Sequence, residues 1–202
     1  GLIGGSLALA FKRAGIGNRI IGVSRQETID RAVDQNVIDA GFTYEDLESA
    51  VEQADYVFMC TPISRILELL PSCLDAVKPG CVVTDVGSTK RTVVEAAGAH
   101  PRSDVSFIGG HPMAGSEWKG VDAADPFLFQ NAIYVLTPGV DAQREQVDQM
   151  IEMITRIGAH VMEMDPDTHD RVAAAISHVP QMMATALVGL VGRMNERDGL
   201  PL

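Results

Sequence analysis

The fold is decided by the stretch Asp55-Tyr56-Val57-Phe58-Met59-Cys60-Thr61-Pro62, in which an apolar run stops at a proline. The run predicts a buried strand over 55–60, and the apolar spacing that follows predicts a helix over 63–76. A second apolar run, 81–86, predicts the next strand. Strands that alternate with helices of this length form a parallel sheet with helices on both faces.

The same alternation extends outward along the chain. We expect further strands at 19–23, 105–108, 132–136 and 159–164, and helices at 7–14, 27–35, 46–54, 143–157 and, after a loop at 87–90, through Ala97. After Asp165 the alternation stops, and 168–196 predicts one long apolar helix. We therefore predict an α/β fold, with a Rossmann-type, doubly wound and mostly parallel sheet over 1–165 and the start of an all-helical domain over 166–202. The final helix is too apolar to stand alone, so we expect it to pack on helices beyond Leu202 or on a second subunit.

The composition narrows the class of protein. The 202 residues are 46% hydrophobic and 21% charged, which suffices for a packed core, and the net charge of −11 argues against binding to nucleic acid. We expect no membrane span, because no apolar run approaches ~18 residues, and no signal peptide is visible. The cysteines, Cys60, Cys73 and Cys81, lack metal-ligand spacing. We expect reduced, structural thiols in a cytoplasmic protein and no metal site.

The chain opens on half of a dinucleotide-binding motif. Gly1-Leu2-Ile3-Gly4 supplies the last two glycines of G-x-G-x-x-G at the start of a helix. Glycine lets the backbone approach a pyrophosphate, and the helix N-terminus offers free N–H groups and the positive end of its dipole. The first glycine and its strand, which is central in this topology, are expected before residue 1. A glycine-rich helix start without a nucleotide is the alternative.

The end of the second expected strand indicates which dinucleotide binds. NAD-binding folds usually place an acidic residue there, for the ribose 2′-hydroxyl. Here 20–23 is followed by Ser24 and Arg25 instead. A hydroxyl and a guanidinium suit a 2′-phosphate, so we expect NADP in preference to NAD. The alternative is that Arg25 is an ordinary surface arginine.

A histidine follows another expected strand. Gly109-Gly110-His111-Pro112 predicts a segment that is neither helix nor strand, with His111 at the carboxyl edge of the sheet, where α/β enzymes place their chemistry. A turn whose histidine only bonds locally is the alternative. Thr61-Pro62 and Ser88 follow two other strands at the same edge, although Ser88 suits an N-cap equally well.

The long terminal helix carries polar residues that a plain core does not need. Helical spacing places His169 and Ser177 on the same side, and His178 follows directly. Pro180 removes the hydrogen bond to the carbonyl of Ile176, which predicts a kink beside them.

These segments together resemble the prephenate/arogenate dehydrogenases of tyrosine biosynthesis. The resemblance covers nearly the whole chain and rests on five motifs: Gly1–Ser6, Cys60–Pro62, Asp85–Lys90, Gly109–Glu117 and His169–Pro180. It implies an NAD(P)-dependent oxidative decarboxylation. The hydrogen on ring carbon C4 leaves as hydride, the C1 carboxylate leaves as CO2, and the ring becomes aromatic.

The resemblance also implies a role for each candidate residue. His111 would accept the proton of the C4 hydroxyl, and Ser88 would hydrogen-bond that hydroxyl or the imidazole. His169, Ser177 and His178 would lie near the nicotinamide and substrate, and Glu117 at the mouth of the pocket. Histidine has an ordinary pKa near 6.5, so we expect activity to rise with pH as His111 titrates. The cofactor would be held by Gly1, Leu2, Ile3, Gly4, Ser24, Arg25, Thr61 and Pro62.

Two features separate the possible substrates and rivals. Gln181 stands where many prephenate-using members have a second histidine, so Gln181 and Ser24-Arg25 look more like NADP-dependent relatives that convert arogenate to tyrosine. The family implies a homodimer through the helical domain and a substrate-binding arginine beyond Leu202. A β-hydroxyacid-type dehydrogenase is less favoured, because it needs a lysine in the helical part and none follows Lys119. A non-catalytic NADP-binding domain would need neither His111 nor His169.

Overall fold

A five-stranded sheet forms the centre of the computed structural model, which describes residues 1–100 and 102–199. Its strand order is β3-β4-β5-β6-β7, with bounds Tyr56–Met59, Val82–Asp85, Ser106–Pro112, Ile133–Pro138 and His160–Glu163. β3, β4 and β5 are parallel, β6 pairs antiparallel with β5, and β7 is parallel to β6. The sheet is thus mostly parallel, and the predicted fold class is confirmed.

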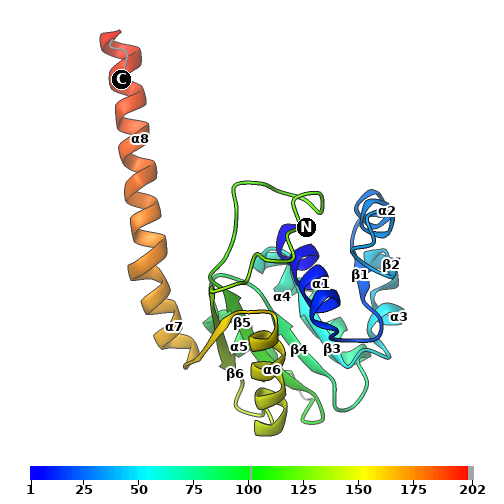
Figure 1. The fold of residues 1–202 in the computed structure, drawn as a ribbon. Helices are drawn as coiled ribbons and strands as arrows, with labels where there is room; N and C mark the ends of the chain where they lie inside the picture. Colours follow the sequence, from blue (N-terminus) through cyan, green and yellow to red (C-terminus); the bar gives the residue numbers. More distant parts are fainter. Residues whose placement is uncertain (101, 200–202) are drawn as a thin grey trace.

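Helices cover both faces of this sheet (Figure 1). α1 (Leu2–Ala14) and α6 (Arg144–Arg156) pack on one face, while α3 (Leu47–Val51), α4 (Ile63–Ala76) and α5 (Arg91–Gly98) pack on the other. The period of two along a strand explains this: Val82 belongs to the first core, and its neighbour Val83 to the second. Both valines are fully covered, so the central strands are apolar on both faces.

A small second sheet lies beside the first. β1 (Ile21–Val23) pairs in parallel with β2 (Ala40–Phe42), and α2 (Gln26–Asp34) connects them. β2 could not be predicted from the sequence, because a three-residue strand with a central glycine shows no periodicity. The helix expected over 46–54 is shorter, since a 3₁₀ turn at Tyr44–Asp46 precedes α3.

β5 runs through His111 to Pro112, so the expectation of an irregular segment there is wrong. His111 pairs with Val135 and Pro112 with Tyr134 of the antiparallel strand β6. On its other side β5 loses its partner earlier, because the last β4–β5 pair is Thr84 with Ile108. A proline is tolerated at the end of a strand, and glycines are tolerated where another chain segment comes close. Antiparallel pairing with β6 therefore outweighs the local preference for a turn.

The chain ends in a long helix that projects from the α/β body (Figure 1). It consists of α7 (Pro166–Ala173), a π-helical segment (Ala174–His178) and α8 (Val179–Asp198). Asp165 caps its start by accepting a 2.9 Å hydrogen bond from the Thr168 N–H. The π segment ends two residues before Pro180, where we expected a kink, because proline offers no N–H to continue the α-helical ladder.

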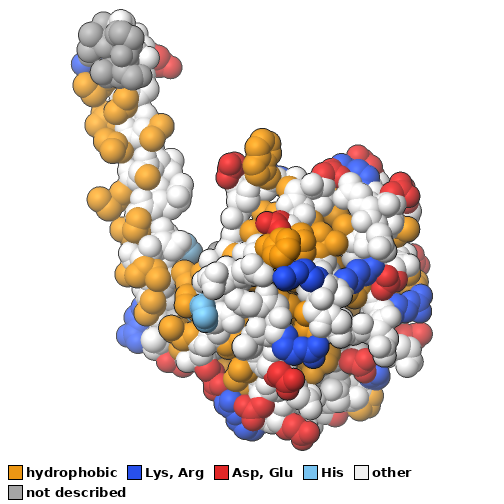
Figure 2. Space-filling model, in the orientation of Figure 1, with side chains coloured by type: hydrophobic (Ala, Val, Ile, Leu, Met, Phe, Trp, Pro, Cys, Tyr) orange, Lys and Arg blue, Asp and Glu red, His pale blue; other side chains and the backbone are white. Residues whose placement is uncertain are grey.

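This terminal helix is also long and apolar enough to span a membrane. The described stretch Pro166–Arg197 contains a window with a mean hydropathy of 1.4, none of it buried. The expectation that no segment reaches this length is therefore wrong, since no charged residue lies between Arg171 and Arg193. Large exposed side chains run along the helix (Figure 2), among them Met182, Met183, Leu187, Val188 and Leu190. An apolar surface of this extent needs a covering partner, and a helix that packs against other helices in an assembly can be equally long and apolar.

Candidate active site

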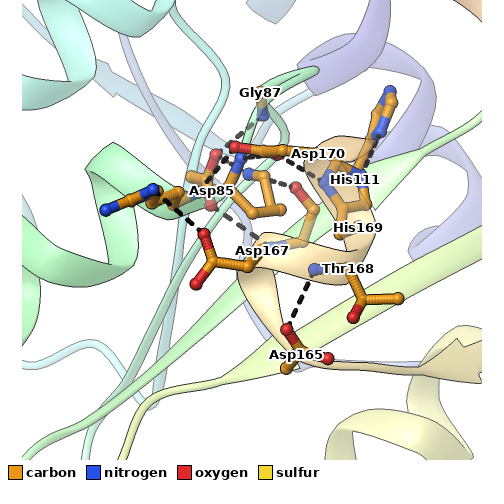
Figure 3. A network of polar contacts seen from close by, with 11 residues as sticks. Asp85, Gly87, His111, Asp165, Asp167, Thr168, His169 and Asp170 are labelled. Carbon is orange, nitrogen blue, oxygen red and sulfur yellow. Dashed lines mark hydrogen bonds and ion pairs between the residues drawn. The ribbon is translucent and has the colours of Figure 1, made fainter. Parts of the chain in front are cut away.

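Two histidines from distant parts of the chain meet at the end of β5. Nδ1 of His111 lies 2.8 Å from Nε2 of His169, the two rings meeting edge to face, as Figure 3 shows. His169 comes from α7 and is 2% exposed, whereas His111 is 9% exposed. His111 is therefore the more accessible of the two histidines, and His169 is the more deeply buried.

Asp170 connects this pair to α5. Its Oδ1 lies 2.7 Å from Nδ1 of His169 and accepts a 2.7 Å hydrogen bond from the Lys90 N–H, and its Oδ2 accepts one of 3.1 Å from the Arg91 N–H. α5 has no capping side chain from its own N-cap residue, Lys90. Asp170 thus caps α5 from α7.

The surroundings of Asp170 favour its carboxylate form. Partial burial alone would raise the pKa of Asp170, but hydrogen bonds from the Lys90 N–H, the His169 ring and the Arg91 N–H outweigh it and lower that pKa below 3.8. The carboxylate therefore only accepts hydrogen bonds at neutral pH.

A buried ion pair fixes the backbone just before His111. Lys90 Nζ donates to the Asp85 carboxylate, and both side chains are fully buried. Lys90 Nζ also donates to the Gly110 carbonyl at 2.7 Å, and Asp85 Oδ1 accepts from the Gly110 N–H at 3.2 Å. A Cβ on Gly110 would lie 2.5 Å from the Asp85 carbonyl oxygen. The ion pair thus hydrogen-bonds the N–H and the carbonyl of Gly110 on the side where β4 has ended. Glycine at this position lets the backbone of β5 come close to that of Asp85.

Sequence reasoning gave Asp85, Lys90 and Asp170 no role. All three lie inside the quoted motifs, but a charged residue in such a motif reads as a surface residue until its partners are known. Burial raises the pKa of Asp85 and lowers that of Lys90, while the attraction between the two charges opposes both shifts. The available signal was a carboxylate at the end of an apolar strand, a position that needs a buried partner.

The same surroundings lower the pKa of His111 to about 4. Burial is the main cause, and the neighbouring His169, Lys90 and His178 add to it. His111 is therefore neutral at pH 7, with one ring nitrogen free to accept a proton. His178, half-buried in the π segment, is close enough to act on His111 electrostatically.

Four other predicted residues make no hydrogen bond to this network within the described part of the chain. Ser88 is exposed in the loop after β4, and it does not cap α5, whose N-cap is Lys90. Ser177 and Gln181 are exposed on the terminal helix, and Glu117 is exposed in the loop between β5 and β6. That loop packs over the start of α1, where the Asp125 N–H donates to Ser6 Oγ at 2.9 Å. It therefore links the histidine site to the glycine-rich helix start.

The start of α1 has the features of a phosphate site. The first helical hydrogen bond runs from the Gly5 N–H to the Gly1 carbonyl at 2.9 Å, so the N–H groups of 2–4 have no partner within the helix. A Cβ on Gly4 would lie 3.1 Å from the Cβ of Cys60, whereas one on Gly1 would meet nothing within 4 Å. Gly4 thus lets α1 pack closely on the end of β3, and Gly1 leaves open space.

Two further polar groups near the start of α1 have no partner among the described residues. Thr61 Oγ1, beside Pro62 at the start of α4, is buried and has no hydrogen-bond partner among the described residues. Ser24 and Arg25 follow β1, and Arg25 is exposed at the start of α2. Its guanidinium makes no hydrogen bond or ion pair within 1–100 and 102–199, whereas that of Arg31 binds Asp122 at 2.8 Å. These free groups fit a bound nucleotide.

Comparison with known proteins identifies close relatives of this arrangement. A family model described as the nucleotide-binding domain of prephenate dehydrogenase matches residues 7–163. The prephenate dehydrogenase of Bacillus subtilis (strain 168) is 42% identical over 190 residues, which cover 93% of this chain and 51% of that relative. The chain thus spans about half the length of this relative.

Two solved structures are similar over nearly the whole chain. The prephenate dehydrogenase of Aquifex aeolicus in complex with hydroxyphenyl propionate and NAD+ has a TM-score of 0.87 at 30% identity, covering 96% of this chain and 67% of that one. The arogenate dehydrogenase of Synechocystis has a TM-score of 0.83 at 38% identity, covering 94% of this chain and 66% of that one.

Proposed function

Because the chain belongs to the prephenate dehydrogenase family, we propose that the protein oxidatively decarboxylates prephenate to 4-hydroxyphenylpyruvate with a nicotinamide cofactor. The observation that carries this proposal is the His111–His169 pair at the end of β5, which leaves one neutral imidazole facing outward. A proton acceptor of this kind is the main group the reaction needs from the protein, since aromatisation and loss of CO2 provide the driving force.

In the proposed reaction, His111 takes the proton of the C4 hydroxyl as that carbon becomes a carbonyl. A bound nicotinamide cofactor would supply the acceptor for the hydride that leaves C4. The electron pair of the C1–carboxylate bond then enters the ring, CO2 leaves, and the oxygen at C4 regains a proton to give the phenol. The low pKa of His111 keeps its ring neutral for this step, so the acid limb of kcat/KM is expected near pH 4 instead of 6.5.

The exposed residues around the pair suit contacts to the substrate. We propose that Ser88 hydrogen-bonds the C4 hydroxyl. Ser88 lies in the loop that follows β4 and leads to Lys90. Ser177, His178 and Gln181 would face the substrate from the terminal helix, and Glu117 from the β5–β6 loop. Their side chains are exposed or half-buried, as groups that bind a ligand must be before it arrives.

The decisive experiment uses the full-length protein with prephenate and NADP or NAD, followed at the reduced-nicotinamide absorbance. We expect steady reduction by the wild type and a fall in turnover of about 100-fold or more for His111→Asn. Unchanged turnover of this variant would reject His111 as the base. Absence of reduction with prephenate and with arogenate would reject the activity itself, and would favour a non-catalytic nucleotide-binding role.

For the cofactor we propose NADP in preference to NAD. Gly1 to Gly4 and the buried Thr61 hydroxyl, beside Pro62, would meet the pyrophosphate side, and Ser24 and Arg25 the 2′-phosphate. This proposal is supported by the guanidinium of Arg25, which follows β1 and has no hydrogen-bond or ion-pair partner among the described residues. The Aquifex relative was solved with NAD+, so the two cofactors must be compared directly.

Arogenate is the second candidate substrate. The Synechocystis arogenate dehydrogenase is 38% identical to this chain. Gln181 and Arg25 also favour an NADP-dependent enzyme that uses arogenate. Prephenate and arogenate differ only in a keto or an amino group on the side chain. The ratio of kcat/KM for the two substrates, measured on one preparation, decides between them.

We also propose that the full-length protein is a homodimer assembled through the helical part. The exposed apolar residues of α8 are the support, because such a surface is a liability when uncovered. Sedimentation as a monomer at micromolar concentration would contradict this. A cytoplasmic location is proposed on the free state of Cys60, Cys73 and Cys81, with burial raising the pKa of each thiol to about 12.

A further inference from the structure

The contact between His111 and His169 leaves one question of chemistry open. Two neutral imidazoles joined by one hydrogen bond share a single proton between them, so one ring must donate and the other accept. If His111 donated from Nδ1, its Nε2 would carry the lone pair. If His111 accepted at Nδ1, its Nε2 would carry the proton instead. Only the first arrangement leaves the outward nitrogen able to act as a base.

Asp170, which contacts the other nitrogen of His169, indicates which ring donates. As a carboxylate it can only accept, so the 2.7 Å contact to Nδ1 of His169 requires the proton on that nitrogen. When the His169 ring carries only this one proton, it has none on Nε2, and Nε2 accepts from His111. The 2.8 Å contact between the rings is therefore donated by Nδ1 of His111.

We propose that Asp170 and His169 act as positioning residues that hold the proton of His111 on Nδ1 and so present Nε2 as the base. This rests on the proposed function, in which His111 takes a proton from the substrate. The order carboxylate, imidazole, imidazole extends by one ring the principle of a Ser-His-Asp triad, where the aspartate fixes the tautomer of its histidine.

The anchoring of Asp170 makes this arrangement rigid. Its two oxygens also accept from the N–H groups of Lys90 and Arg91, so the carboxylate cannot rotate away without uncapping α5. Arg91 forms a second tie to α7, with Nη1 3.2 Å from Asp167 Oδ1. His169 is 2% exposed, which leaves water little access to exchange the roles of its nitrogens. Orientation of the base thus depends on contact between α7 and α5.

The first test is made on the wild type. Full-length protein labelled with ¹⁵N-histidine is examined at pH 7 by long-range ¹H–¹⁵N NMR, with His111→Asn and His169→Gln used to assign the signals. We expect the Nδ1–H tautomer for both His111 and His169. A proton on Nε2 of His111 in the wild type would overturn the proposal.

The second test removes the carboxylate. In Asp170→Ala we expect the His111 signal to become a mixture of tautomers and kcat to fall about tenfold to 100-fold, with KM changed less than about threefold. A merely structural role would lower the unfolding midpoint and leave the tautomer of the folded protein unchanged. Wild-type kcat or a retained Nδ1–H tautomer in folded Asp170→Ala would overturn the proposal.

A matched pair at His169 separates hydrogen-bond acceptance from bulk. His169→Gln places an amide oxygen near the position of Nε2, where it can accept from His111, whereas His169→Asn reaches only the position of Nδ1. We expect His169→Gln to retain about tenfold more kcat than His169→Asn. Equal activity of the two variants would contradict the proposal.

The outcomes also separate this proposal from the proposed function. If His111→Asn keeps full turnover, the assignment of His111 as the base fails even where the tautomers are as expected. If His111→Asn is inactive but wild-type His111 carries its proton on Nε2, only the positioning role of Asp170 and His169 fails.

Discussion

The two ends of the candidate site are built in opposite ways. At the nucleotide end, 2–4, Thr61 and Arg25 present polar groups without partners among the described residues. At the histidine end, Asp85, Lys90 and Asp170 are hydrogen-bonded to the groups around them, and Nε2 of His111 has no partner among the described residues. A ligand bound through many phosphate oxygens is met by uncommitted donors. A single proton transfer is served by fixing everything around one atom.

This difference predicts that substitutions at the histidine end affect folding strongly and those at the nucleotide end hardly at all. The largest effect is expected for Lys90→Met, which leaves the Asp85 carboxylate buried without a counter-charge and should cost about 3–5 kcal/mol of unfolding free energy. Urea denaturation of the full-length protein measures it. Arg91→Ala, which removes exposed ion pairs, is the matched control and should cost less than about 1 kcal/mol. Similar losses for the two variants would remove the contrast.

The next effect is on the pH dependence of stability. The unfolded chain protonates His111 near its ordinary pKa of 6.5, but the folded protein only near pH 4, because burial opposes the charge. Stability contributed by the neutral ring is therefore complete above about pH 6.5 and is lost as the pH falls toward 4, by up to about 3 kcal/mol. Denaturation of the wild type and His111→Asn at pH 7 and pH 4.5 gives the difference. A variant with the wild-type slope would show that His111 does not resist protonation.

Two glycines provide the third comparison. Gly110→Ala drives a Cβ to within 2.5 Å of the Asp85 carbonyl oxygen, which should cost about 1–3 kcal/mol and displace His111. Gly1→Ala meets nothing within 4 Å, so stability should not change while the Kd for the nucleotide rises several-fold. Denaturation and a nucleotide titration of both variants test this. A destabilised Gly1→Ala protein would mean that the open space at the helix start serves folding.

The smallest effect on folding is expected for Arg25→Ala. Its guanidinium has no partner among the described residues, so the unfolding free energy should change by less than about 0.5 kcal/mol. KM for NADP should nevertheless rise about tenfold or more, and KM for NAD should stay the same. Arg31→Ala serves as a control, because Arg31 is already paired with Asp122. Equal changes in the two KM values would reject a 2′-phosphate contact.

The same contrast explains what the sequence could predict. The alternation of strands and helices follows from local periodicity, and α4 begins and ends where the pattern predicts. The path of β5 through His111 could not be predicted, because two glycines and a proline suggest a turn and only pairing with β6 overrides them. Asp85, Lys90 and Asp170 escaped notice for a related reason. Their roles depend on partners from β4, α5 and α7, which no local pattern brings together.

The π-helical segment gives the terminal helix an angular phase that is set by one residue. A π turn holds about one residue more than an α turn over a similar rise, and an α-helix turns by about 100° per residue. If the same residues relaxed to an α-helix, α8 would keep its direction while its faces rotated by about 100° relative to His169, whereas deleting Ala174 at the same time would restore the present phase. The angle between the side of the helix that carries His169 and the apolar side that needs a partner thus depends on the π conformation of a five-residue stretch.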